Sequence, residues 1–191
     1  SQTTTAIANS GTVISNNNIF DFFGAAVASA GIHVANGCNA WTISGNRFYQ
    51  TGTRTWTTGA NHRPIEIIGT SIVFGAQGFS ITGNTIGFAS NTQTGTYTLT
   101  GSTGKFAGIV FNGATAGAAN TINNNTVAAV SLTGVTSNGT NASTPFVGIL
   151  AQNGPVTTNG NVVGSQSAPG SLVYSTTTTA GTDVYGIFNF S

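Results

Sequence analysis

One short motif recurs five times along this chain, and it restricts the possible folds more than any other feature of the sequence. Four copies open with isoleucine, at residues 14, 43, 81 and 122, and the fourth position of every copy is asparagine. Repeats 29 to 41 residues apart predict a stack of similar units, because one such unit cannot bury an apolar face alone. The repeated asparagines are Asn17, Asn46, Asn84, Asn125 and Asn161.

A second motif alternates strictly with the first. Its first two copies are Gly31–Val34 and Pro64–Ile67, and later copies begin at Gly108, Gly148 and Gly186. Apolar residues occupy alternate positions in both motifs, so each motif predicts a short strand with one buried face. Helical periodicity is absent, while glycine, asparagine and β-branched residues occur throughout the chain.

These patterns predict an all-β fold. We expect a right-handed, single-stranded parallel β-helix, or solenoid, of about five coils with long Thr- and Gly-rich loops. We expect residues 1–191 to form one domain that is a fragment of a longer chain. Alternating stretches at residues 96–100 and 171–175 would form third strands of their coils or hairpins that extend from them; we expect third strands for part of each stretch and projecting loops for the rest. The loops that we expect between the Asn motif and the next strand motif include Gln50–Arg63, Ala89–Lys105, Ser131–Pro145 and Gly164–Asp183.

The recurring asparagines have a structural interpretation. A short amide side chain tolerates the left-handed backbone of a tight turn, and a glycine precedes it in three copies of the motif. Coils stacked about 4.8 Å apart would allow successive amides to hydrogen-bond to each other in a ladder. We therefore expect the five asparagines to form one column with a structural role rather than a ligand-binding role.

The chain carries very little charge. Four Lys and Arg stand against three Asp and Glu, so charged residues make up 4% of the sequence. Without a basic stripe a nucleic-acid partner is not expected, and without an apolar run of about 20 residues neither is membrane insertion. Cys38 is the single cysteine, which excludes an internal disulfide and a CxxC metal or redox motif. We expect no cofactor and no metal.

The ordered series of motifs resembles a known family. The Ile-Ser-Gly-Asn and Ile-Thr-Gly-Asn strands, the Gly-Ile strands and the Thr-rich segments are similar to pectate-lyase-like parallel β-helix repeats. More narrowly, they resemble the β-helix regions of very large secreted Bacteroidetes proteins exported by the type 9 system. The resemblance covers residues 13–189. It implies an extracellular or cell-surface, adhesin-like protein, whose coil ends are covered by neighbouring domains of the same long chain or by end-to-end copies.

The resemblance also implies what an enzyme on this fold would need. Such enzymes degrade polysaccharides with clustered aspartates, or with acidic residues that hold calcium and a basic residue that abstracts a proton. This chain has only Asp21, Glu66 and Asp183, which we expect in different coils or on different faces. We therefore predict no catalytic residues, and the leading hypothesis is a non-enzymatic structural or adhesive segment. A divergent polysaccharide lyase or hydrolase stays an alternative.

A carbohydrate-binding module is the second hypothesis. Most of the positive charge lies near the second coil, where aromatic faces and guanidinium donors would suit a sugar ring. The expected contacts are Trp56, Arg54 and Arg63. An ice-binding β-helix is also conceivable from the Thr content, but it needs a flat, regular Thr grid, and the coils differ in length.

One further pair of residues is singled out by its position. His33 and Glu66 each follow the isoleucine of the second motif, so they are expected to be neighbours on an outer face. They would form a surface hydrogen-bonded pair, or part of a general-base or metal site if His62 joined them from its loop. The same column continues as Val110, Leu150 and Phe188, which either lie under long loops or line a groove for a partner.

Overall fold

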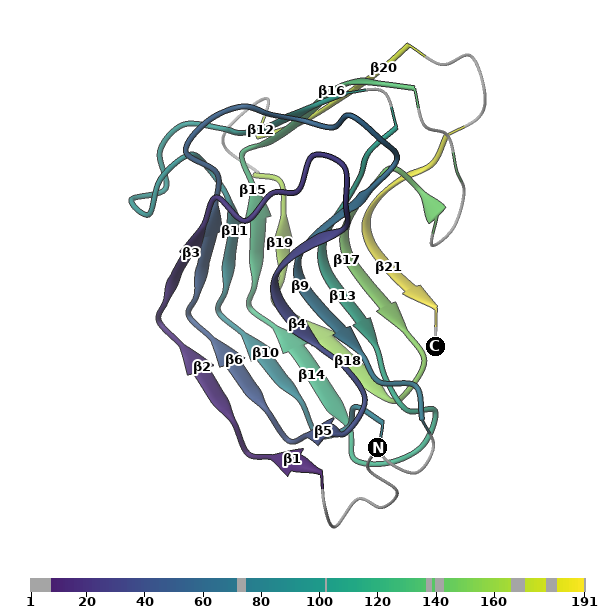
Figure 1. The fold of residues 1–191 in the computed structure, drawn as a ribbon. Helices are drawn as coiled ribbons and strands as arrows, with labels where there is room; N and C mark the ends of the chain where they lie inside the picture. Colours follow the sequence, from purple (N-terminus) through teal and green to yellow (C-terminus); the bar gives the residue numbers. More distant parts are fainter. Residues whose placement is uncertain are drawn as a thin grey trace.

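The computed structural model describes residues 8–71, 75–101, 103–136, 139, 143–165, 171–177 and 182–190. In this part of the chain the protein is all-β, and the strands of every sheet run parallel to one another (Figure 1). Four larger sheets carry the structure, and a two-stranded pair joins β1 (Asn9–Ser10) to β5 (Cys38–Asn39). The sequence-based expectation of parallel β structure is confirmed.

Each of the four larger sheets collects strands from successive repeats. Sheet 1 holds β2 (Val13–Ser15), β6 (Thr42–Ser44), β10 (Ser80–Thr82), β14 (Asn120–Asn123) and β18 (Val156–Asn159). Sheet 2 holds β3 (Asn18–Phe20), β7 (Arg47–Tyr49), β11 (Thr85–Gly87), β15 (Thr126–Ala128) and β19 (Val162–Val163). Sheet 3 holds β8 (Arg54–Thr55), β12 (Tyr97–Thr100), β16 (Val130–Val135) and β20 (Leu172–Thr176). Sheet 4 holds β4 (Ser29–Val34), β9 (Asn61–Ile68), β13 (Lys105–Asn112), β17 (Phe146–Gln152) and β21 (Val184–Phe190).

The chain visits these sheets in a fixed order. From the second repeat onward it passes through sheet 1, sheet 2, sheet 3 and sheet 4 before it returns to sheet 1. In the first repeat the described residues between β3 and β4 form no strand, and they lie beside the second repeat instead. There the backbone N–H of Thr57 donates to the carbonyl of Ala25 at 2.9 Å. Each repeat therefore pairs only with the repeat before it and the repeat after it.

The two sequence motifs supply the core in strict register. Ile14, Ile43, Ile81 and Ile122 are paired from strand to strand in sheet 1, and the last three are fully buried. In sheet 4 the isoleucines of the second motif are paired in the same way, at residues 32, 65, 109, 149 and 187. Alternation along each short strand thus places these isoleucines inside, while the outward positions of sheet 4 hold both polar residues, such as His33 and Glu66, and apolar ones, such as Val110.

The five repeated asparagines lie in one column between sheets 1 and 2. Each of the first four donates its side-chain amide to the Oδ1 atom of the next asparagine, at 2.9–3.0 Å. The same Oδ1 atom also accepts the backbone N–H of the preceding asparagine in the column, at 2.9–3.0 Å. Asn46, Asn84 and Asn125 are almost completely buried. The structure therefore brings together all the residues expected in the ladder.

The turn at the ladder differs in one respect from the expectation. The left-handed backbone falls on the residue before each ladder asparagine, with φ of 56–65° at Asn16, Gly45, Gly83, Asn124 and Gly160. The ladder asparagines themselves are not among the described residues with positive φ. Glycine and asparagine occupy all five of these positions, and they are the residues that adopt the left-handed backbone at the lowest cost.

The expected third strands are present as sheet 3. Residues 97–100 form β12 and residues 172–176 form β20, although parts of the long segments lie outside the described residues. The segment Gln50–Arg63 was expected to be a loop, and this is wrong in part, because it contains β8 and the beginning of β9. His62 consequently lies in a strand, where its position faces the core, and not in a loop.

The ladder predicts that a substitution in its middle lowers the free energy of unfolding more than a substitution at its end. Replacing Asn84 by alanine leaves the backbone and side-chain amides of Asn46 and the carbonyl of Ile43 without their partner. Each unsatisfied buried group costs about 1–3 kcal/mol, so we expect the free energy of unfolding to fall by about 3 kcal/mol or more. Urea unfolding followed by circular dichroism measures this change.

The matched control is Asn17→Ala at the exposed end of the ladder. Asn17 donates to Ser15 and Asn46 but accepts from no other asparagine among the described residues. Its loss should therefore cost less than about 1 kcal/mol. Equal losses for the two variants would contradict the ladder as the source of stability.

Candidate functional site

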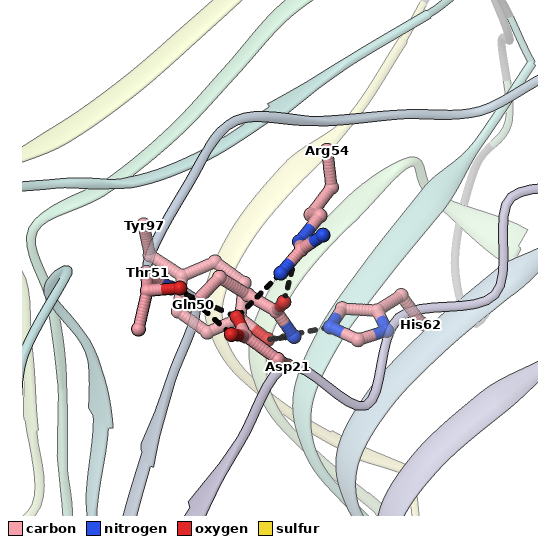
Figure 2. A network of polar contacts seen from close by, with 6 residues as sticks. All are labelled: Asp21, Gln50, Thr51, Arg54, His62 and Tyr97. Atoms are coloured by element: carbon pink, nitrogen blue, oxygen red, sulfur yellow. Dashed lines mark hydrogen bonds and ion pairs between the residues drawn. The ribbon is translucent and has the colours of Figure 1, made fainter.

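A chain of polar side chains crosses the interior at the start of the stack (Figure 2). Arg54 Nε donates to Gln50 Oε1 at 3.0 Å, and Gln50 Nε2 donates to the hydroxyl of Tyr97 at 3.3 Å. The hydroxyl of Tyr97 contacts His62 Nε2, and Nδ1 of the same ring lies 2.7 Å from Ser29 Oγ. The chain of contacts therefore runs from sheet 3 to sheet 4 and joins residues of three successive repeats.

An ion pair anchors the outer end of this network. Arg54 Nη2 lies 2.6 Å from Asp21 Oδ1, and Thr51 donates its backbone and side-chain groups to the same carboxylate. Burial acts to raise the pKa of Asp21, but the hydrogen bonds from Thr51 and Arg54 outweigh it and hold the pKa below its ordinary value. Asp21 belongs to the first repeat, so this pair fastens that repeat to the second.

His62 is the most constrained member of the network. Its side chain is fully buried, with the ring of Phe22 stacked on it at 5.0 Å and the ring of Phe23 edge-on at 5.3 Å. Burial lowers the pKa of His62 to about 3, because the apolar surroundings disfavour the charged ring. The imidazole is therefore neutral at physiological pH.

Both nitrogens of the His62 ring have hydrogen-bond partners. Gln50 donates to the hydroxyl of Tyr97, which contacts Nε2 of His62, while Nδ1 of the same ring contacts Ser29 Oγ. The neutral ring carries one proton, so one of its two nitrogens donates and the other accepts. Burial also raises the pKa of Tyr97 above its ordinary value, so the phenol keeps its proton. The network is suited to holding repeats together rather than to moving protons.

A second polar group lies on the outer face of sheet 4. His33 and Glu66 are paired across β4 and β9, and His33 Nδ1 donates to Glu66 Oε2 at 2.7 Å. Arg63 Nη1 donates to the other carboxylate oxygen. The side chain of His33 is 52% exposed and that of Glu66 is 14% exposed. These two residues and the segment Ala28–Ala30 line an open hollow of about 340 Å³.

The structure corrects two of the expected ligand contacts. Trp56 is only 4% exposed, because its indole packs edge-on against Phe23 and over Gly104, where a Cβ atom would collide with the ring. An aromatic ring in that position cannot offer its face to a sugar. His62 is buried as well, so it cannot complete a metal site with His33 and Glu66. Arg54 is partly exposed, but its guanidinium is bound to Asp21 and Gln50.

The outer column beyond Glu66 forms a second apolar cluster. Val110 and Leu150 are each 2% exposed and pack with Ala107 and Val147, against Tyr185 and Phe188. Tyr185 and Phe188 stack with their ring centroids 4.6 Å apart. Val110 and Leu150 are therefore covered, whereas Phe188 is only partly buried.

The carboxylates of the described residues are held by other groups in separate segments. Asp21 follows β3 and binds Arg54, Glu66 lies in β9 and binds His33 and Arg63, and Asp183 precedes β21 and accepts from Tyr185 at 2.8 Å. The described part of the chain shows no group of three His, Cys, Asp or Glu side chains arranged to hold a metal. Over the same residues, no helix has the length and hydropathy needed to cross a membrane.

The chain matches no family model, no curated protein and no solved structure in comparisons with all three.

Sequence reasoning did not find the network itself. Ser29 and His62 occupy the position two residues before the second motif, where the later repeats have Phe106 and Phe146. Phenylalanine at this position in later repeats indicates that the position faces the core. Two polar residues at the same position in the first two repeats could therefore have indicated a buried polar network. Tyr97 carries no comparable signal, because tyrosine is a common residue in strands.

The buried imidazole predicts a pH dependence of stability. The unfolded chain binds a proton at His62 below about pH 6.5, whereas the folded chain does so only near pH 3. The free energy of unfolding therefore falls as the pH decreases through this window, by about 2 kcal/mol between pH 7 and pH 5. Urea unfolding at a series of pH values measures the slope.

Two variants separate this effect from other titrations. His62→Gln keeps a donor and an acceptor but cannot ionise, so we expect a flatter profile between pH 7 and pH 5. His33→Gln removes the exposed imidazole and should leave most of the slope in place. A His62→Gln profile as steep as the wild-type profile would contradict the assignment.

Proposed function

We propose that this chain is a segment of a right-handed parallel β-helix with a structural or adhesive, non-enzymatic role in a secreted bacterial cell-surface protein. The observation that carries the proposal is the fixed visiting order of the four parallel sheets, combined with an asparagine column that continues through all five repeats. Parallel strands joined by crossovers are right-handed in about 98% of cases, which gives the proposed hand. The resemblance to β-helix regions of large Bacteroidetes surface proteins points to the same role.

The two ends of the stack suggest which partners it has. Val13, Phe20 and Val27 are exposed on the first repeat, and Val162, Ile187 and Phe190 are exposed on the last. The backbone N–H of Asn161 has no acceptor among the described residues, whereas the equivalent N–H groups of the other ladder asparagines are satisfied. We propose that these edges are covered by neighbouring domains of a longer chain or by end-to-end copies.

The proposed location can be tested on intact cells. Antibodies raised against this chain should label unpermeabilised cells of its source organism, and external protease should remove the label. Antibodies against a cytoplasmic protein, used on the same cells, should label only after permeabilisation. Labelling of this chain that also requires permeabilisation would contradict a cell-surface role.

Carbohydrate binding is a second candidate, and the hollow beside His33 and Glu66 is the observation that favours it. A carboxylate that accepts and an imidazole that donates suit the hydroxyl groups of a sugar, and the Arg63 guanidinium holds the carboxylate from beside the hollow. Because Trp56 is buried, the candidate contacts become His33 and Glu66, with Arg63 as a positioning residue. The charges of Glu66 and Arg63 cancel, and this favours an uncharged glycan.

A glycan array with matched variants tests this candidate. Binding of an uncharged glycan by the wild type should be lost in Glu66→Gln, because the carboxylate would no longer accept strongly or hold Arg63 in place. Arg54→Lys alters a guanidinium outside the hollow and should bind like the wild type. If no array glycan binds, or if Glu66→Gln binds normally, the hollow is not a glycan site.

A further inference from the structure

The core of the stack is open at the last repeat, which lies at the opposite end from the first repeat (Figure 1). Two inward side chains of β21 are exposed there, Val184 to 48% and Ile187 to 43%. Their partners one repeat earlier, Phe146 and Ile149, are almost completely buried. In the described part of the chain, these two inward columns therefore end without a neighbour that covers them.

The two ends of the asparagine ladder are complementary. Inside the ladder, an asparagine donates its backbone N–H and its side-chain amide to the Oδ1 atom of the asparagine in the next repeat. Asn161 has no acceptor for its backbone N–H among the described residues, and its side-chain amide donates to the preceding repeat, at Ile122. Asn17 Oδ1 accepts no hydrogen bond from a described residue. The last repeat thus offers the donors, and the first repeat the acceptor, of one further rung.

A hollow at the last repeat matches an aromatic ring of the first repeat in position. The hollow has a volume of about 160 Å³, and Val163 of sheet 2 and Val184 of sheet 4 are among the residues that line it. Val163 belongs to the same inward column as Phe48, and Val184 to the same inward column as His62. Phe22 packs on both Phe48 and His62, with ring centroids 6.3 Å and 5.0 Å apart. In a second copy stacked in register on the last repeat, Phe22 would therefore lie over the hollow.

The hydroxyl group of Tyr174 also favours a polypeptide at this end. Tyr174 lines the same hollow, and its hydroxyl oxygen is buried without a hydrogen-bond partner among the described residues. A buried hydroxyl without a partner is unfavourable. The edge strands of a docked copy carry unpaired backbone donors and acceptors, so they can supply such a partner.

The direction of the strands determines how a second copy is oriented. The strands of sheets 1, 2 and 4 are parallel from the first repeat to the last. A copy displaced along the stack would therefore continue each of these sheets with the same parallel pairing. A copy related by a twofold axis would bring two last repeats together with antiparallel strands, and the donor ends of the two ladders would face each other.

We propose that copies of this chain associate head to tail, with the last repeat of one copy on the first repeat of the next. The inference rests on the stacked fold of the proposed function, and it selects end-to-end copies as the partner. Because every bound copy still has one free end, the contact continues into a filament. Each copy adds five repeats, so the filament should repeat along its axis about every 24 Å, at about 4.8 Å per repeat.

Sedimentation velocity over a range of concentrations tests the proposal on the wild-type chain. We expect species larger than a dimer whose mass rises with concentration, and negative-stain electron microscopy should show unbranched rods of constant width. A chain that stays monomeric at every concentration, or that stops at a dimer, would overturn head-to-tail association. If Asn84→Ala and Asn17→Ala still change stability as predicted above, that result would leave the stacked fold and the proposed structural role in place.

Two arginine substitutions in the last repeat separate the contact surface from its surroundings. Val184→Arg places a charge at the hollow, in a column that is apolar in the two preceding repeats, and should keep the chain monomeric. Val162→Arg is the matched control, because Val162 is 45% exposed and lies in an outward column. In the second repeat this column holds Arg47 between Asn18 and Thr85, so an arginine fits between stacked neighbours there. Val162→Arg should therefore assemble like the wild type.

The two arginine variants are compared after circular dichroism and thermal unfolding have shown that both fold. Val184→Arg that assembles like the wild type would overturn the proposed contact. An equal loss of assembly in Val184→Arg and Val162→Arg would overturn it as well, because the effect would then not depend on the hollow.

Engineered disulfides test the register of the contact. Ser15 and Asn159 are the first and last members of one outward column of sheet 1, so a continuous stack places Asn159 of one copy beside Ser15 of the next. With Cys38→Ser as the background, Ser15→Cys combined with Asn159→Cys should give a series of disulfide-linked oligomers on non-reducing gels. Within one copy the two positions are about 19 Å apart, which is too far for a disulfide.

The matched control combines Asn159→Cys with Val13→Cys in the same background. Val13 lies two residues before Ser15 on the same strand, so it would be about 8 Å from Asn159 of the next copy, beyond the reach of a disulfide. We expect few linked oligomers from this pair. No linked oligomers from the pair at Ser15 and Asn159, or equal amounts from both pairs, would overturn the proposal.

Discussion

The architecture depends on one repeated interaction, in which the Oδ1 atom of each buried asparagine accepts two hydrogen bonds. One oxygen takes both the backbone N–H and the side-chain amide of the preceding asparagine, and each side-chain amide from Asn46 onward also donates to a carbonyl of the repeat before. Without these hydrogen bonds, the corner between sheets 1 and 2 would bury several unpaired polar groups. Burying an unpaired polar group costs a large amount of free energy. The column satisfies them and fixes the register in the same step, because a shift of one residue would break every rung.

The first repeat uses a different means of attachment. The described part of this repeat has no strand in sheet 3, and the rings of Phe22 and Phe23 pack there on His62 and Trp56. The polar network from Arg54 to Ser29 then connects three repeats at a place where backbone pairing is short, since β8 has only two residues. Apolar stacking and a fully connected polar chain thus replace the missing ladder of backbone hydrogen bonds.

The sequence predicted the features that arise from local repetition. The asparagine column and the inward isoleucines follow from alternation and equal pairing, and neither requires knowledge of distant residues. The sequence did not predict the burial of Trp56, because that depends on Gly104, which leaves room for the indole from the next repeat. The sequence also placed His62 in a loop and not in a strand, because the later repeats have phenylalanine at the position that His62 occupies. Coil length also does not predict the regularity of a sheet, because the strands of sheet 1 pair without a register shift although the repeats differ in length.

The separation of variable segments from regular sheets has a practical consequence for protein engineering. The turn near Ser90–Thr94 is solvent-exposed and closes on itself through the hydrogen bond from the backbone N–H of Ala89 to the carbonyl of Thr94. Its ends are therefore already close together, and lengthening a loop with fixed ends adds little entropic cost. A foreign peptide inserted at this turn would be displayed on a stiff scaffold at a defined height along the stack, with the paired strands on either side left intact.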